Sequence, residues 1–277
     1  MIRASALCAL LIGLPVVASG QSGTVRYDQA TRIDFQAPPN MPREMVANIP
    51  KASVRPMQLR FSAEAVLFGP APVAAGAAGS SVAGAPMAIS VGRGEMMVRE
   101  VAVADMAGAA FFMGGPAGGR MDAVAGAFTN LVDGSYVEVR NFLGRTFRIP
   151  EARPSFAWKL TGEAASFLGY PVYQAIAKQD STTLEAWFTP DIPVSAGPAQ
   201  YGGLPGLILT LAVDSNRVVY TATAVDTTTA VGKVTAPSDG SKVTRAEYDK
   251  IVADKQAEMA KSRRGRGIGR ASCRERV

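Results

Sequence analysis

The stretch AWFTPDIPVSAGPAQYGGLPGLILTL, residues 186–211, joins two segments of β-strand composition by a connection much longer than a turn. From Thr189 to Gly206 it carries four prolines and four glycines in eighteen residues, whereas a hairpin loop has about two to five residues. Prolines restrict the backbone and glycines tolerate positive φ, so the chain is first stiffened and then sharply redirected. We expect a packed Ω-type loop, with Leu204 as an apolar plug that folds it back against a sheet.

The segments around this loop predict a mainly β protein. Leu207–Val213 is apolar on both faces, which indicates an inner strand covered on both sides. Other runs alternate in polarity and are separated by the short turn sequences TGE, KQDST and VDSNR, the rhythm of an antiparallel meander. We therefore expect an α+β fold that is mainly β, a twisted antiparallel sheet or half-barrel meander. The other segments expected to be strands are 24–35, 57–68, 135–142, 145–149, 155–160, 170–178, 183–189 and 217–225.

A long insertion interrupts the predicted sheet. From Gly69 to about Gly126 the composition falls to alanine, glycine, proline and methionine, which lack the large apolar side chains needed to offset the entropy of ordering. We interpret the segment as a flexible low-complexity insertion between two strands. The run GEMMVREVAVADM, residues 94–106, could instead form one short strand crossing it. A membrane-active or self-associating role is the other alternative, suggested by Met96, Met97 and residues 111–113.

One helix is predicted near the C-terminus. Thr244 can act as the N-cap, with Glu247 three residues later to complete a capping box. Val243 and Tyr248 occupy the two positions of a hydrophobic staple. A modest apolar stripe follows, so we expect the helix to pack on the sheet. The stripe consists of Tyr248, Ile251, Val252 and Met259.

The two ends of the chain have the composition of segments outside the folded domain. Residues 1–20 have a basic start, an apolar stretch and a small-residue exit, which predicts a signal peptide cleaved before Gln21. Residues 21–260 are then a single domain. Residues 261–267 form a basic tail, and residues 268–277, IGRASCRERV, resemble the translation of a common sequencing adapter. We therefore expect a periplasmic or secreted protein with no membrane span after cleavage.

Charge and residue usage narrow the function. The formal net charge is +6, but Arg3 and the last seventeen residues account for the excess, so residues 21–260 carry −1, and nucleic acid is not an expected partner. The chain has no histidine, and its two cysteines, Cys8 and Cys273, lie in the predicted signal peptide and the adapter-like segment. This usage excludes His/Cys metal sites, disulfides and His-dependent nucleophilic catalysis from the domain. We expect no cofactor and no metal.

The loop and its flanks resemble the GLPGLI family, a group of exported bacterial proteins of unestablished function found mostly in Bacteroidetes. The motif is Gly203-Leu204-Pro205-Gly206-Leu207-Ile208, and the upstream stretches FRIPEARPSFAWKLTGE and LGYPVYQAIA also fit, so the resemblance covers about residues 125–260. The alanine- and glycine-rich composition is untypical of the family's usual hosts. The resemblance implies structural roles for Trp158, Pro190, Pro193 and the six motif residues.

Three classes of function are consistent with this sequence. The first is non-enzymatic binding of an apolar small molecule or a cell-envelope protein by the concave face of the sheet, with Trp187, Asp191 and Tyr201 at its mouth. Each of the three also has a structural interpretation: Trp187 as core, Asp191 in a Pro-Asp turn, and Tyr201 packed over the glycines. The second is a carboxylate- or metal-dependent hydrolase using Glu185, Asp191 and Asp214. The third is a structural component of a cell-envelope complex.

Overall fold

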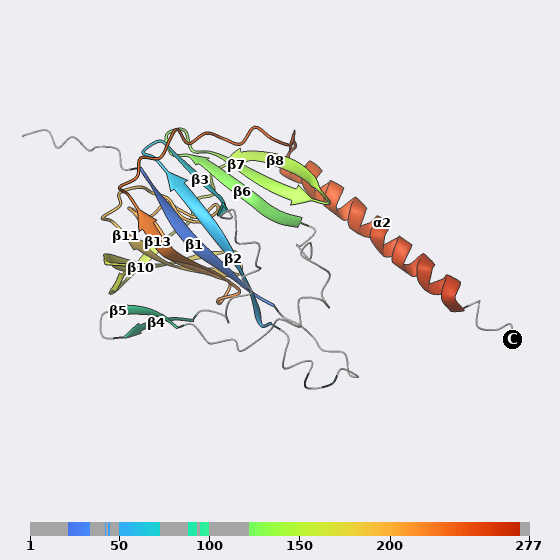
Figure 1. Ribbon diagram of the computed structural model, residues 1–277, viewed down its shortest axis with the longest axis horizontal. Coiled ribbons are helices and arrows are strands. Elements are labelled where there is room, and N and C mark those ends of the chain that lie inside the picture. Colours follow the sequence, from blue (N-terminus) through green and yellow to red (C-terminus); the bar gives the residue numbers. More distant parts are fainter. Residues whose placement is uncertain are drawn as a thin grey trace, which may run out of the picture.

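A single fourteen-stranded sheet dominates the structure (Figure 1). The computed structural model describes residues 22–33, 50–72, 88–92, 95–99 and 122–271, together with positions 42 and 44. The strand order is β14-β8-β7-β6-β3-β2-β1-β13-β12-β11-β10-β9-β5-β4 and the sheet does not close. The strands are β1 Gly23–Arg32, β2 Ala52–Phe61, β3 Ala65–Pro70, β4 Ala88–Gly92, β5 Glu95–Arg99, β6 Asp122–Asn130, β7 Ser135–Phe142, β8 Arg145–Ala152, β9 Lys159–Phe167, β10 Tyr170–Gln179, β11 Thr182–Thr189, β12 Leu207–Val213, β13 Val218–Asp226 and β14 Ser241–Lys242.

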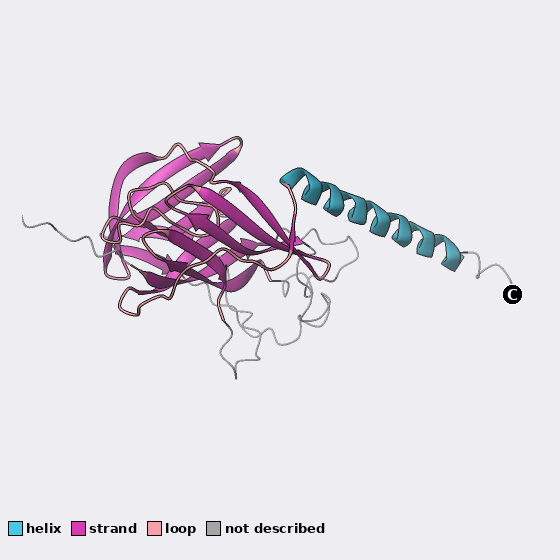
Figure 2. Cartoon of the chain, turned by 90° about the horizontal axis from the view of Figure 1, so that it is seen from above, coloured by secondary structure: helices cyan, strands magenta, loops and turns pink. Residues whose placement is uncertain are grey.

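The pairing is antiparallel except at two places near the edges. β14 runs parallel to β8 over two residues, and β5 meets β9 in parallel through Glu95 and Ser166. The predicted mainly β fold, with its twisted antiparallel sheet and C-terminal helix, is confirmed (Figure 2). Tight turns generate the meander: Leu143 and Gly144 both have positive φ in the two-residue turn between β7 and β8, as the twist of a hairpin favours.

Three details of the predicted strands are wrong. Segment 57–68 is not one strand but part of the β2–β3 hairpin, in which the Ala65 amide donates to Ser62 Oγ at 3.1 Å. The break in its alternation was the signal of that turn. In segment 155–160 the strand begins only at Lys159, because the aromatic residues before it pack against the loop instead. Strand β6 begins at Asp122, before the predicted end of the insertion at about Gly126.

The low-complexity segment lies largely outside the described residues. Within it, β4 and β5 form a hairpin from Ala88 to Arg99, so part of the GEMMVREVAVADM run is a strand, and residues 73–87 and 100–121 are outside the description. The predicted inner strand is confirmed: β12 lies between β11 and β13 and is buried on both faces over its first six residues.

Helix α2, Arg245–Ala271, begins where the capping box predicts. The Thr244 amide donates to Glu247 Oε2 at 2.8 Å, and the Glu247 amide donates to Thr244 Oγ1 at 3.3 Å. Tyr248 is buried against Phe147 on β8, with the ring centroids 5.4 Å apart. Only these first turns reach the sheet, and the helix then projects beyond it (Figure 1). None of the described helices is both long and apolar enough to cross a membrane.

Candidate functional site

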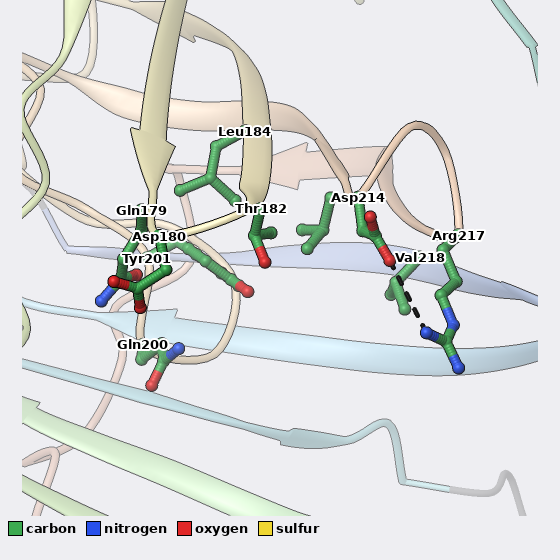
Figure 3. Close-up of a pocket in the computed structure, with 10 residues that line it drawn as sticks. Gln179, Asp180, Thr182, Leu184, Gln200, Tyr201, Asp214, Arg217 and Val218 are labelled. Atoms are coloured by element: carbon green, nitrogen blue, oxygen red, sulfur yellow. Dashed lines mark ion pairs between the residues drawn. The ribbon is translucent and has the colours of Figure 1, made fainter.

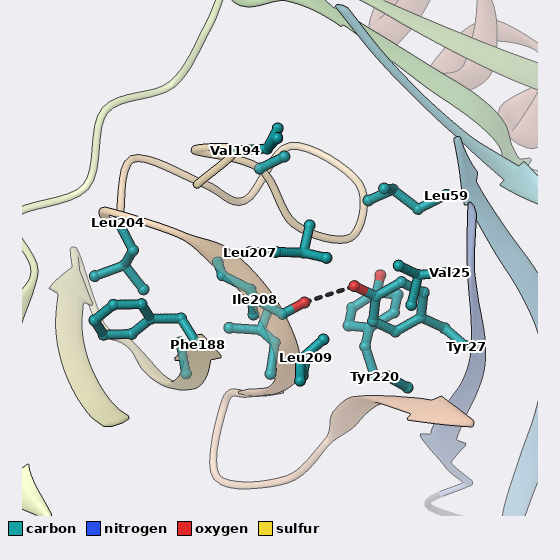
Figure 4. Packing of buried hydrophobic residues seen from close by; sticks show 14 of the residues in the cluster. Val25, Tyr27, Leu59, Phe188, Val194, Leu204, Leu207, Ile208, Leu209 and Tyr220 are labelled. Atoms are coloured by element: carbon teal, nitrogen blue, oxygen red, sulfur yellow. Dashed lines mark hydrogen bonds between the residues drawn. The ribbon is translucent and has the colours of Figure 1, made fainter. Parts of the chain in front are cut away.

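The loop at 190–206 packs against the hydrophobic core and is bonded to the start of β12. Its Ile192 and Ala196 carbonyls accept hydrogen bonds from the amides of Leu207 and Ile208 at the start of β12, at 3.1 and 2.9 Å. Ile192, Val194, Ala196 and Leu204 are all buried in the main hydrophobic cluster. The predicted packed loop with Leu204 as its plug is what the structure has: the Leu204 side chain is 2% exposed and lies beside Phe188 (Figure 4).

Side chains from three distant segments lock this loop and its strand. The Tyr27 hydroxyl on β1 donates to the Ile208 carbonyl at 2.5 Å (Figure 4). The Arg153 guanidinium donates to the Ser195 carbonyl at 2.5 Å, and the Trp158 indole N–H donates to the Gly202 carbonyl at 2.9 Å. Burial raises the pKa of the Tyr27 phenol and lowers that of the Arg153 guanidinium. The loop is thus held in one conformation by both its backbone and its surroundings.

Two motif glycines differ in what they allow. Gly206 has φ +155°, and a Cβ there would stand 2.1 Å from the Thr189 carbonyl oxygen, so only glycine fits. Gly203 has φ +92° but nothing closer than 3.8 Å, at the Trp158 indole nitrogen. Leu204, Gly206, Leu207 and Ile208 are buried, whereas the prolines of the loop at 190, 193 and 205 are exposed. The motif therefore anchors the loop to the core through Leu204 and the consecutive residues Gly206 to Ile208.

A cleft of about 370 Å³ opens where this loop meets the ends of two hairpins (Figure 3). Its back wall is apolar and its rim is polar. Gln200 and Tyr201 come from the loop, and the remaining residues come from β10 to β13 and their turns. The apolar lining residues are Leu184, Val213 and Val218, and the polar ones are Gln179, Asp180, Thr182, Gln200, Asp214 and Arg217.

Tyr201 is the aromatic group of the cleft. Its ring packs between Phe156, at a centroid distance of 5.4 Å, and Tyr220, at 6.4 Å. Burial raises the pKa of the Tyr201 phenol, and a hydrogen bond with Gln200 opposes part of that rise. Because its pKa is raised, the Tyr201 phenol is neutral at physiological pH and can donate or accept a hydrogen bond.

At the rim of the cleft, Arg217 and Asp214 approach to 3.6 Å, but both side chains are about half exposed, so the pair adds little stability.

The structure places the three residues predicted for the mouth in different surroundings. Tyr201 lines the cleft. Trp187 is 1% exposed on β11, and its indole N–H lies 3.4 Å from Glu185 Oε1. Asp191 is exposed in the turn after β11, where its amide donates to Thr189 Oγ1 at 3.3 Å. Ligand binding by these residues stays a prediction, and only Tyr201 lies at the cleft.

The three carboxylates of the hydrolase hypothesis lie apart. The Asp214 amide bonds to the Thr183 carbonyl at the start of β11, whereas Asp191 follows the end of that strand. Six residues of strand separate Thr183 from Thr189, which is roughly 20 Å. Glu185 accepts a hydrogen bond from Gln174 at 2.8 Å on the neighbouring strand. Within the described ranges, no three acidic, histidine or cysteine side chains are grouped as a metal site would need.

The sequence alone did not indicate most of the polar residues at the rim of the cleft. Gln179 and Asp180 belong to the KQDST turn, and Asp214 and Arg217 to the VDSNR turn. Both segments were recognised as turns, and Asp180 and Asp214 have positive φ there. Their convergence depends on β10 to β13 being consecutive neighbours in the sheet. A meander brings every second turn to the same end, which is the signal that could have grouped them.

The comparisons with known proteins give a family match over a short stretch and two solved structures of low similarity. A family described as "Protein of unknown function (Porph_ging)" matches residues 174–210, from β10 through the loop into β12. No curated protein matches the chain. The solved structure described as "Structure of PNGF-II in P21 space group" has a TM-score of 0.49 at 14% identity, covering 83% of this chain and 32% of that one. The corresponding structure in the C2 space group has a TM-score of 0.47 at 15% identity, covering 84% and 32%. This chain thus spans about a third of their length.

Proposed function

We propose that this is an exported, non-enzymatic binding protein of the GLPGLI type, acting in the periplasm or at the cell surface. Its ligand is a small molecule with an apolar body, held in the cleft beside Tyr201. The apolar wall of Leu184, Val213 and Val218 receives the body, and the amides of Gln179 and Gln200 hydrogen-bond its polar end. Sites of this kind are concave, apolar at the back and carry a few polar groups that set orientation.

The observation that carries the proposal is the fixation of the loop that supplies Tyr201. Hydrogen bonds from Arg153 and Trp158 to loop carbonyls hold the segment in place before any ligand arrives, and Tyr27 holds the strand that follows it. A preformed wall lowers the entropy lost on binding. The match to residues 174–210 covers this same segment, which supports treating it as the part of the chain that carries the common role.

Native mass spectrometry of the protein recovered from a bacterial periplasm tests this proposal. We expect a co-purifying small molecule that is released on denaturation. Thr182→Tyr places a bulky side chain at the edge of the cleft in a strand position that favours aromatic residues, and it should abolish co-purification while the protein stays folded. Tyr173→Ala, which removes an exposed aromatic side chain of β10 outside the cleft, should retain the ligand. An empty wild-type protein, or a ligand retained by Thr182→Tyr, contradicts the proposal that the cleft binds a small molecule.

A structural role in a cell-envelope complex is the second candidate, and one observation favours it. Helix α2 extends well past its contact with the sheet (Figure 2), and its side chains from Ala253 to Glu258 are all exposed. Such a helix is a natural contact arm. Ending the chain after Ala253 should leave the cleft ligand in place. If it instead removes a partner captured by cross-linking from the envelope, the assembly role is favoured over the binding role.

A further inference from the structure

A second hollow lies on the opposite face of the sheet from the cleft. Along β2 the side chains alternate, so Leu59 is buried on the inner face while Gln58 and Arg60 lie on the outer face. These two line a groove of about 480 Å³ that crosses the ends of β3, β6, β7 and β8. Its far wall is Pro237 and Asp239 of the segment after β13. The groove shares no lining residue with the cleft.

Arg60 gives this groove a defined chemistry. Its Nε is fully enclosed and has no hydrogen-bond partner among the described residues. A buried donor left unsatisfied is costly, and a guanidinium is costlier than a neutral group. Arg148, on the same face of the sheet, is engaged differently, since its Nε and Nη1 donate to the carbonyls of Gly240 and Pro237 at 3.2 and 3.4 Å. Arg60 is therefore the positive group in the lining that is left to meet a ligand.

Two glycines, which have no side chains, form the floor of the groove and leave space above it. Gly69 on β3 is the cross-strand neighbour of Gln58, and a Cβ there would lie at ordinary contact distance, 3.5 Å from the Ala125 carbonyl oxygen. Gly126 directly follows the register shift in β6, and a Cβ there would lie 3.2 Å from the Phe68 carbonyl oxygen. Glycine inside a strand often marks close approach of another group. Here the missing side chains leave room beside Leu67 and Val139, which supply apolar contact.

We propose that this groove is a binding site for a small organic carboxylate with an apolar tail. The carboxylate accepts hydrogen bonds from the two terminal amino groups of the Arg60 guanidinium, because Nε is enclosed by the protein and this planar group matches a carboxylate. The tail lies over the glycine floor against Leu67 and Val139. Asp239, the acidic residue in the lining, disfavours ligands of higher negative charge, so a monoanion fits better than a phosphate. This site is independent of the proposed cleft ligand.

Backbone amide NMR of the full chain titrated with hexanoate tests the site, with hexan-1-ol and inorganic phosphate as matched probes. Hexanoate should shift the Gly69 and Gly126 amides in a saturable way and should leave the Tyr201 amide unmoved. Hexan-1-ol and phosphate should bind at least about tenfold more weakly, because the first lacks the charge and the second lacks the tail. Equal binding of hexan-1-ol, tighter binding of phosphate, or no shift at either glycine overturns the proposal.

Two variants test separately the positive charge of Arg60 and the space above Gly69. Arg60→Gln should weaken hexanoate about tenfold or more, while Arg55→Gln, an exposed arginine of the same strand outside the lining, should leave it unchanged. Gly69→Val fills the floor from a strand position without positive φ, and should abolish binding with the thermal midpoint maintained. Unchanged hexanoate affinity in Arg60→Gln or in Gly69→Val refutes the site, whatever happens at the cleft.

Discussion

The inner face of the sheet is covered by two unlike pieces of chain. The loop at 190–206 covers the half formed by β1 and β11 to β13 without any regular structure, through carbonyls bonded to side chains 42 and 44 residues away in sequence. The first turns of α2 cover β7 and β8 through a local capping box and a short apolar patch. The loop is part of the main hydrophobic cluster, and the helix has a separate small one.

This difference predicts two levels of stability. Regions with few buried contacts open locally, whereas elements of the central core open only with the whole domain. We expect the helix to detach from β8 while the sheet and loop stay folded. The electrostatic contacts of the helix do not change this expectation: Arg245 binds Glu138 and Glu151, but its side chain is 34% exposed, so solvent screens much of the attraction.

The largest expected effect is that of Gly206→Ala. The added Cβ would meet the Thr189 carbonyl at 2.1 Å in a backbone conformation that L-residues rarely adopt, so the loop must leave the core. We expect a loss of more than about 4 kcal/mol, which is a large part of the roughly 5–15 kcal/mol that stabilises a typical domain. Hydrogen exchange should increase in every strand of the sheet. Gly203→Ala, with space around its Cβ, should cost only about 1–2 kcal/mol of backbone strain, and an equal loss in both variants would contradict the steric argument.

Tyr248→Ala tests the helix side of the comparison. Its ring fills the small cluster with Phe142, Phe147 and Ile149, and truncating a buried aromatic side chain costs about 3–5 kcal/mol. Because that cluster is separate, the loss should appear as detachment of α2. Amide exchange should increase in α2, β7 and β8 and remain unchanged in β11 to β13. Faster exchange throughout the sheet would show that helix and loop belong to one cooperative unit.

The structural features that the sequence predicted correctly are those encoded by neighbouring residues. The capping box at Thr244, the inner strand at Leu207–Val213 and the plug at Leu204 all follow from neighbours within a few residues. The strand at Asp122–Asn130 was missed because DAVAGAFTN continues the small-residue composition of the insertion. The locking side chains Tyr27, Arg153 and Trp158, and the rim of the cleft, depend on strand order, which no local pattern gives. The same is true of Arg60, whose groove is formed by five strands and a distant segment.

Alkaline pH should lower the stability of the core region that the loop at 190–206 covers. Burial raises the pKa values of Tyr27 and Tyr220 above the ordinary tyrosine value, and that of Tyr201 less strongly. The folded state therefore holds these protons more tightly than the unfolded state, whose tyrosines titrate near about pH 10. Stability should be fully present below about pH 10 and fall as pH rises above it. In Tyr27→Phe, unfolding should cost about 1–2 kcal/mol less at neutral pH, because the Ile208 carbonyl loses its donor, and the alkaline decline should be shallower. Denaturant unfolding at neutral and at alkaline pH measures both.

The smallest effect should come from the capping box, and it has the opposite pH dependence. Hydrogen bonds from Thr244 lower the pKa of the Glu247 carboxyl below its ordinary value. Its contribution is therefore present above the unfolded value of about 4.3 and is lost as pH falls through the lower folded value. Thr244→Ala should destabilise the start of the helix by about 1 kcal/mol at neutral pH, measured as faster exchange of the first amides of α2. It should reduce the acid dependence of that exchange without removing it, because the amide of residue 244 still donates to Glu247. Glu258, which pairs with Lys255 in the exposed part of the helix, supplies the control: Glu258→Gln should leave the exchange of those first amides and its pH profile unchanged. If Thr244→Ala instead accelerates exchange in β12, the start of the helix is coupled to the loop and the two coverings of the sheet are not independent.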